Sequence, residues 1–205
     1  MGIDIFWWFY KVEPAEIEVV QLEFERGTSG VPSLPEVPAL TPRPQAPPVT
    51  QEYFNLVLEG VLAGRDLTSQ LYHEPFDSLA TRIFKENFPV SSENLVGSVM
   101  QSRVVPAAIL LMGIGSERFS QLPGALGNML VHPSEVELTI ESVARILDVD
   151  WESYFQRAKL VLDYAGFDDH ATKDVSDALG AIPKALEKVK DEGAGLLAVT
   201  SWGCP

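Results

Sequence analysis

The three histidines are the side chains of this sequence that are best suited to acid–base or metal chemistry. They stand at positions 73, 132 and 170, and no two of them have the helical spacing that places two imidazole rings on one metal ion. His73 is followed by Glu74, but Pro75 comes next and no histidine stands four residues after His73, so the zinc-protease motif fails. We therefore predict no metal site built on the histidines.

Other motifs that carry chemistry are incomplete. Residues 168–170 (Asp-Asp-His) can ligate a divalent cation, but an exposed loop between helices explains them equally well. The alternating acids of residues 148–152 lack the glycine that a calcium-binding loop requires. Residues 112–115 contain a Gly-x-Gly pair, with Arg118 where a dinucleotide-binding turn has its third glycine. Cys204 is a poor nucleophile candidate because a chain end is normally frayed. We predict no catalytic residue, no metal ion and no cofactor.

A pocket assembled from distant residues leaves no motif, so aromatic and polar side chains are the first candidates for one. Trp7 and Trp8 are adjacent, and adjacent residues of a strand face opposite ways, so at most one of them points into the main core. The other meets a covering helix or lines a groove, and a core position is favoured over a ligand platform. The candidate binding residues are Trp7, Tyr10, His73, Glu74 and His132.

The elements that must position these residues begin with an aromatic strand. Residues 6–10 are five consecutive aromatics, which predict a strand over residues 3–10 that is covered on both faces. A short apolar segment at residues 196–200 predicts a last strand that pairs with the first. Residues 13–25 are ambiguous: the Glu-Pro at 13–14 is typical of a helix start, whereas the later alternation is typical of a strand. We favour a strand from residue 19, in a hairpin with the first.

Helical periodicity recurs through the rest of the chain. Pro183 falls inside the last predicted helix and is expected to kink or split it. Residues 104–131 are the least polar part and are interpreted as core followed by a loop. Ala144 and Trp151 are among the residues expected to face inward. The predicted helices cover residues 53–64, 75–88, 91–100 (with Ser91 or Ser92 as N-cap), 133–147, 150–165 and 172–192.

These elements predict an α+β fold, with a small, mainly antiparallel sheet that contains the N-terminal and C-terminal strands and is covered by about six helices. A chain of 205 residues with 46% hydrophobic residues suits a single domain over residues 1–205. Seven prolines fall within residues 27–50, which we interpret as a proline-rich loop or linker inside that domain.

Charge and cysteine content restrict the partners and the compartment. The net charge is -14, with 29 acidic and 15 basic residues, which argues against nucleic acid and anionic membranes and favours a basic protein partner. The single cysteine excludes an intramolecular disulfide and fits a reducing compartment, so we expect a cytoplasmic location. The apolar run at residues 104–114 is far shorter than the roughly 20 residues of a spanning helix. Because the opening residues lack a basic region and a small-residue cleavage site, we expect no secretory signal there.

Several features, taken in order, resemble the YfbM-like family of small uncharacterised bacterial proteins. They are a Met-Gly start before an apolar strand, the helix segment 53–60, the Pro-Ser-Glu-Val start at 133–136, and the last helix running into Gly193 and residues 196–199. This chain is longer and carries the proline-rich insertion. The resemblance implies an α+β domain with helices packed on a small sheet, and it assigns no catalytic residues.

The acidic balance and the incomplete catalytic motifs favour a non-catalytic binding protein that covers a basic surface on a protein partner, as bacterial immunity or antitoxin proteins do. The alternative is an enzyme or small-molecule-binding domain whose pocket is built from scattered residues. A cleft that gathers two candidate polar groups beside an aromatic ring would favour this alternative, whereas a convex acidic face would favour the protein partner. A structural subunit of a larger assembly is a third hypothesis, and the sequence sets no oligomeric state.

Overall fold

The computed structural model describes residues 4–28, 88–102, 104–124, 127–165 and 171–202. Within these ranges the chain forms one four-stranded sheet in the order β2-β1-β4-β3, and every neighbouring pair is antiparallel. The first and last strands are adjacent at its centre, which confirms the predicted pairing. The strands are β1 (Asp4–Val12), β2 (Leu95–Ser102), β3 (Met129–Val131) and β4 (Gly195–Trp202).

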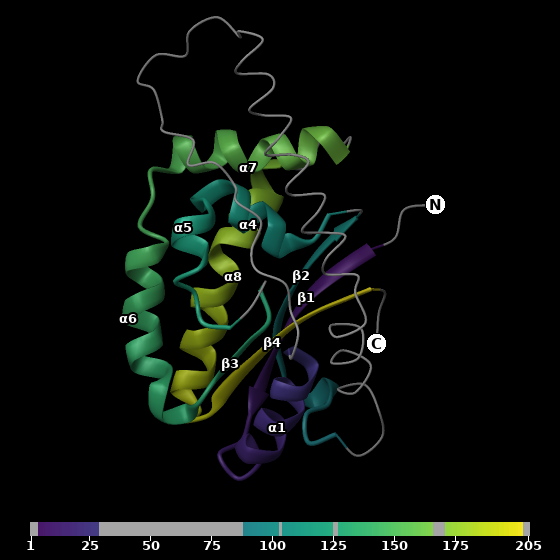
Figure 1. Ribbon diagram of the computed structural model, residues 1–205, viewed down its shortest axis with the longest axis vertical. Helices are drawn as coiled ribbons and strands as arrows, with labels where there is room; N and C mark the ends of the chain where they lie inside the picture. The colour runs from purple at the N-terminus through teal and green to yellow at the C-terminus, as the bar shows by residue number, and fades with distance from the viewer. Residues whose placement is uncertain (1–3, 29–87, 103, 125–126, 166–170, 203–205) are drawn as a thin grey trace, which may run out of the picture.

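Helices cover both faces of this sheet, so the predicted α+β class is confirmed. α1 lies on one side, and α4 and α8 lie on the other; α6 packs against α8, and α7 lies across α4 and α8 (Figure 1). The described α-helices are α1 (Ile17–Thr28), α4 (Pro106–Ile114), α5 (Ser116–Phe119), α6 (Val136–Ile146), α7 (Trp151–Ala165) and α8 (Ala171–Asp191), with 3-10 turns η1 (Ser92–Asn94) and η2 (Pro133–Glu135).

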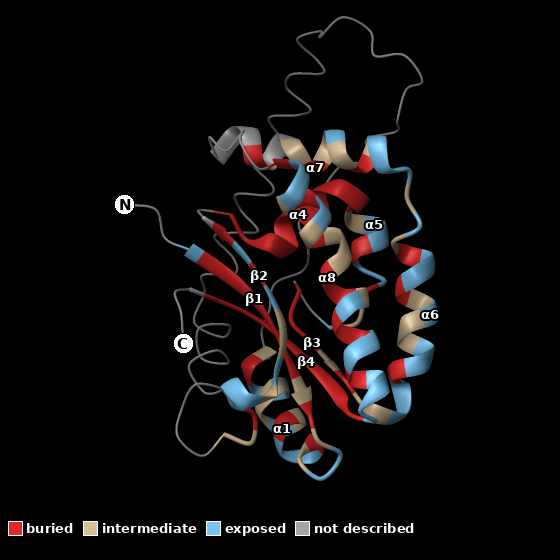
Figure 2. Ribbon diagram, turned by 180° about the vertical axis from the view of Figure 1, so that it is seen from behind, coloured by how far each residue is buried: buried red, intermediate tan, exposed pale blue. Residues whose placement is uncertain are grey.

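β1 is buried on both faces because its large side chains alternate between two cores (Figure 2). Trp7 belongs to the larger core, on the side of α4 and α8, and its indole Nε1 donates to the carbonyl of Gly127 at 2.7 Å. Trp8 belongs to the smaller core, on the side of α1, and its Nε1 donates to Ser201 Oγ at 2.7 Å. Each buried indole therefore has a hydrogen-bond partner, and both tryptophans are core residues.

The strand that we favoured from residue 19 is wrong, because residues 17–28 form α1. Ile17 and Val20 are three residues apart and are buried on one side, against the smaller core, whereas Leu22 is 55% exposed. The alternation of apolar and polar residues here is coincidental, and the helix start at residues 13–14 was the informative signal. Gly27 and Thr28, assigned to the proline-rich loop, end this helix.

The helix predicted over residues 91–100 is also wrong. Ser91 does cap a helix, but only the short η1: its Oγ accepts from the backbone N–H of Glu93, and Asn94 Oδ1 accepts from the N–H of Ser91. The chain then continues as β2 along β1. The valines of this segment suit a strand as well as a helix face, and pairing with the buried β1 decides between the two.

Residues 104–131 contain more regular structure than the predicted core and loop. Pro106 begins α4, whose nine residues are all buried, so that no periodicity marks the helix in the sequence. The predicted helices over residues 133–147, 150–165 and 172–192 are confirmed as η2 with α6, as α7 and as α8. Ala144 and Trp151 are exposed rather than inward, and Pro183 lies inside one continuous α8 rather than splitting it.

Two predicted helices, over residues 53–64 and 75–88, lie outside the described residues, apart from Phe88 at the end of the second. Residues 29–50 of the proline-rich segment also lie outside them. No helix in the part of the chain that the structure describes has the length and apolar character needed to cross a bilayer.

Candidate binding groove

The structure does not bring the candidate binding residues together. Trp7 and Tyr10 are both buried, but they lie in different cores on opposite faces of the sheet. His132 is half-buried before η2, with its Nε2 2.9 Å from Gln21 Oε1 of α1. His73 and Glu74 lie outside the described residues. The part that these residues play in binding stays a prediction.

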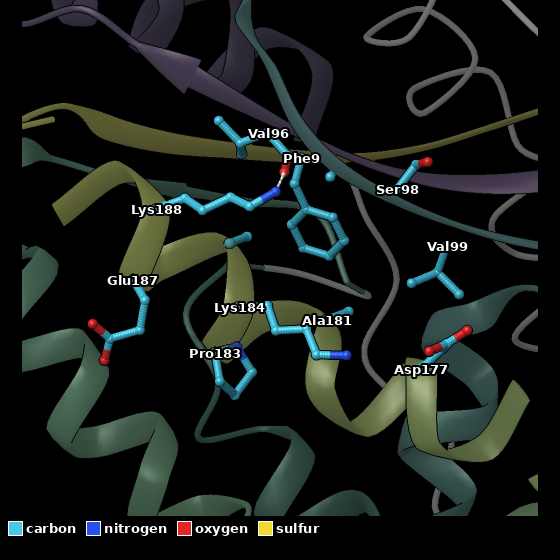
Figure 3. Close-up of a pocket in the computed structure, with 12 residues that line it drawn as sticks. Phe9, Val96, Ser98, Val99, Asp177, Ala181, Pro183, Lys184, Glu187 and Lys188 are labelled. Carbon is cyan, nitrogen blue, oxygen red and sulfur yellow. Dashed lines mark hydrogen bonds between the residues drawn. The ribbon is translucent and has the colours of Figure 1, made fainter. Parts of the chain in front are cut away.

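A groove of about 540 Å³ lies between the edge strand β2 and α8 (Figure 3). None of the binding residues predicted from the sequence lines this groove. It does place the Phe9 ring near lysine and acidic side chains of α8. Its volume is within the range of small-molecule sites. The lining residues are Phe9 of β1; Val96, Gly97, Ser98 and Val99 of β2; and Asp177, Ala181, Pro183, Lys184, Ala185, Glu187 and Lys188 of α8.

Small residues on both walls keep the groove open. Gly97 is paired with Phe9 on the neighbouring strand, and a Cβ atom added to Gly97 would meet nothing within 4 Å. Ala181 and Ala185, on the facing side of α8, present only methyl groups. The Phe9 ring lies at the base of the groove (Figure 3), but it is only 1% exposed and belongs to the larger core.

A β-bulge at one end of the groove is held by a lysine of α8. Phe9 pairs with Gly97 but Tyr10 pairs with Leu95, so Val96 is an extra residue without a partner on β1. The Val96 carbonyl accepts a hydrogen bond from Lys188 Nζ. This charge-assisted bond spans the gap between strand and helix, and it satisfies a carbonyl that the bulge removes from the ladder.

Lys184 lies one turn before Lys188 on the same side of α8. Its stem runs back over Gly180, where an added Cβ would be 3.3 Å from Lys184 Nζ. Figure 3 shows the ammonium group directed along the groove toward its Asp177 end. Asp177 is engaged by Lys173 Nζ, and this hydrogen bond raises the pKa of Lys173. Among the described residues, Lys184 makes no hydrogen bond or ion pair.

The lining of the groove thus contains two lysines, Lys184 and Lys188, and two acids, Asp177 and Glu187. Glu187 lines its rim but points away from Phe9 in Figure 3, so its carboxylate does not neutralise the interior. The described residues of the lining include no histidine or cysteine. Lysine, aromatic and methyl groups can bind and orient a ligand, and the carboxylates of Asp177 and Glu187 are the other charged groups of the lining. No group of three or more His, Cys, Asp or Glu side chains suited to a metal ion occurs within the described ranges.

Sequence reasoning missed this groove because it assigned β2 to a helix. In a helix over residues 91–100, Gly97 would not stand opposite Phe9. The open position at Gly97 could therefore not be recognised from the sequence. The spacing of Lys184 and Lys188 was a usable signal, since residues four apart share one face of a helix.

Comparisons of the chain with models of known protein families, with curated proteins and with solved structures find no match. The resemblance to the YfbM-like family, the single-domain organisation and the cytoplasmic location stay predictions.

Proposed function

We propose that this protein is a non-catalytic binding protein that holds a small organic ligand in the groove between β2 and α8. The observation that carries the proposal is the space beside Gly97, where an added Cβ atom would meet nothing within 4 Å in a groove of about 540 Å³. A ligand that fits a concave site of this volume moves its own apolar surface out of water, and this favours binding.

The groove has the features of a built site rather than of loose packing. The inner side of α8 is closely packed, since Val175, Ala178 and Ile182 are fully buried. The groove runs beside this inner side of α8, from Asp177 to Lys188, and there the Lys188 bond to the Val96 carbonyl joins helix and strand. Protein interiors normally close apolar gaps, because each gap forfeits dispersion contacts.

The test fills the groove from the strand side. Gly97→Leu places a side chain in the groove, whereas Met100→Leu places the same side chain at an exposed position on the opposite face of β2, outside the lining, and serves as the matched control. Anilinonaphthalene sulfonate, an apolar anion, is the fluorescent probe. We expect one saturable site in the wild type and in Met100→Leu, and at least a tenfold loss of affinity in Gly97→Leu. Equal affinity of all three proteins would reject the groove as the binding site.

We also propose a second candidate function, that of an acidic partner for a basic protein surface, as in immunity or antitoxin proteins. The outer face of α6 favours it: Leu138 is 69% exposed and is flanked by the exposed Glu137 and Glu141. An apolar anchor with an acidic rim matches a basic surface that has an apolar pocket.

This second function predicts a salt-sensitive complex that depends on Leu138. The full chain is immobilised, and basic proteins from the native host that bind at low salt are identified by mass spectrometry. A stoichiometric partner should be lost with Leu138→Ala and retained with Leu22→Ala, because Leu22 is 55% exposed on α1, away from α6. Retention by both variants would contradict an α6 interface.

A further inference from the structure

We infer that the ligand of the groove is a basic peptide segment in extended conformation, which adds to the sheet as a further strand along the outer edge of β2. This inference rests on the proposed function, and it names the chemical class of the ligand. Three observations lead to it: the edge position of β2, the part of β2 that borders the groove, and the charge of the chain.

β2 is an edge strand of the sheet. It pairs with β1 on one side, and no described strand pairs with its other side. Residues of an antiparallel strand turn their backbone N–H and C=O groups alternately toward the neighbouring strand and away from it, so residues 97–102 direct about three of each outward. Within the described ranges, these residues make no backbone hydrogen bond to a segment other than β1.

The edge of β2 lacks the residues that usually prevent pairing with another strand. Edge strands are commonly protected by charged side chains or by proline, and the eight residues of β2 include neither. The β-bulge protects only one end of the edge, where Lys188 Nζ donates to the Val96 carbonyl. From Gly97 to Ser102 the pairing with β1 is regular, so the outer edge of this stretch can accept a further strand.

The groove borders the backbone of this edge. Its lining includes the four consecutive residues 96–99 of β2. Ser98 pairs with Trp8 of the smaller core, so the Ser98 side chain lies on the face of the sheet opposite to the groove. Ser98 therefore lines the groove through its backbone, and α8 forms the other wall (Figure 3). A peptide in such a site gains affinity from main-chain hydrogen bonds to the strand and specificity from pockets for alternate side chains.

Side chains of an added strand have room on both faces of β2. On the groove side, a Cβ atom at Gly97 would meet nothing within 4 Å, so the neighbouring side chain of the peptide can occupy this space. On the other side, Leu95 and Met100 are exposed. An apolar side chain of the peptide that lies beside Met100 would remove apolar surface of both from water.

The charge of the chain favours a basic peptide over a second copy of the protein. The lining holds two lysines and two acids, and main-chain hydrogen bonds need no excess of either. The net charge of -14 attracts a basic segment, whereas two copies of the chain repel each other. The favoured occupant is therefore a basic segment of another protein rather than β2 of a second copy.

The test selects peptides of about ten residues from a random phage-displayed library on the immobilised full chain. The tightest binder is then synthesised with N-methyl groups on alternate amides, in each of the two possible frames. We expect a net positive charge in the selected peptide. Methyl groups on the amides that face β2 should lower its affinity at least tenfold, because they remove the donors of the ladder. The other frame is the matched control and should change affinity less than twofold.

Two measurements on the protein locate the peptide. Gly97→Leu should lower the affinity of the unmethylated peptide at least tenfold, and Met100→Leu should not. With the peptide bound, hydrogen exchange should become slower at alternate amides of residues 97–102. Thermal unfolding of each variant confirms that the protein tested is folded.

The outcomes separate the peptide from the groove. If no peptide is selected, or if both N-methyl frames have equal effects, the added strand is rejected, while a loss of the fluorescent probe with Gly97→Leu would still support the groove. If the selected peptide and the probe both bind unchanged to Gly97→Leu, the peptide inference and the proposed function fail together. If sedimentation shows a dimer of the chain in which residues 97–102 are protected from exchange, a second copy is the occupant and the peptide is rejected.

Discussion

Two regions on the larger-core side of the sheet differ in how completely they are packed. At the junction of α4, α7 and α8, a Cβ added to Gly113 would lie 2.1 Å from Tyr154 Cε2, so the tyrosine ring already fills that space. In the groove between β2 and α8, a Cβ added to Gly97 would meet nothing within 4 Å. Both regions use a glycine and the same helix α8, but only the junction has a large side chain that closes the gap.

The comparison shows that the groove is not a consequence of a small or polar core. Tyr154 is fully buried, and its hydroxyl donates to the Val175 carbonyl at 3.2 Å, so α7 and α8 are joined closely. The chain has aromatic residues to fill space and uses them at the junction. We interpret the space that remains at Gly97 as a property of the site, and substitutions at the two regions measure the difference.

The largest effect is expected at the junction. Tyr154→Ala removes a fully buried ring and leaves a cavity between α4, α7 and α8, so the free energy of unfolding should fall by about 4 kcal/mol. Denaturant unfolding followed by circular dichroism measures this change. Tyr154→Phe is the control: it keeps the ring and loses the bond to Val175, and it should lower stability by only about 1 kcal/mol. Equal losses would mean that ring packing does not hold the junction.

The two glycines provide the most direct test of the comparison. Gly113→Ala forces a methyl group into the Tyr154 ring and should destabilise the protein by about 2 kcal/mol. Gly97→Ala adds the same methyl group to open space and should stabilise it by about 0.5 kcal/mol, because glycine weakens a strand. In the Tyr154→Ala background the Gly113 penalty should disappear. If the penalty persists there, the clash with the ring is not its cause.

A third effect appears at alkaline pH. Burial raises the pKa of the Tyr154 phenol above its ordinary value of 10.0, because the phenolate loses its hydration. The unfolded chain releases this proton at a lower pH than the folded protein does. The stability linked to this group is therefore fully present below about pH 10 and is lost as the pH rises toward the raised pKa, by up to about 1.4 kcal/mol per pH unit.

Tyr154→Phe should make the alkaline decline in stability less steep by this amount, and unfolding curves at a series of pH values above 10 measure it. Burial also raises the pKa of Tyr10, so part of the decline should remain in this variant. A slope that does not differ between the two proteins would show that the Tyr154 phenol ionises without unfolding the junction.

The sequence predicted those helices and strands that are specified by the order of side chains within the segment itself. The aromatic run of residues 6–10 required a covered strand, and the periodicity of α6, α7 and α8 is visible in the sequence itself. Prediction failed where a partner far along the chain decides the structure. β2 is a strand because β1 pairs with it, and α4 shows no periodicity because every side of it is buried.

The groove was beyond sequence reasoning for the same reason. It depends on Gly97 standing opposite Phe9 and on Lys188 reaching the Val96 carbonyl, and these residues are far apart in the chain. The candidate residues from the sequence are aromatic or ionisable, whereas the groove is defined mainly by the small side chains of Gly97, Ala181 and Ala185. Small residues signal an open site only when their neighbours are known.

The smallest effect concerns the bond that spans the groove. Lys188→Met keeps the length of the side chain but leaves the Val96 carbonyl of the bulge without its charged donor, so the free energy of unfolding should fall by about 1 kcal/mol. Lys184→Met, one turn away on the same face of α8, removes no bond within the described ranges and should change stability little. Hydrogen exchange at the amides of residues 95–99 should speed up in Lys188→Met alone. If both variants behave alike, Lys188 does not fix the bulge, and the width of the groove is set by the packing of α8 on the sheet instead.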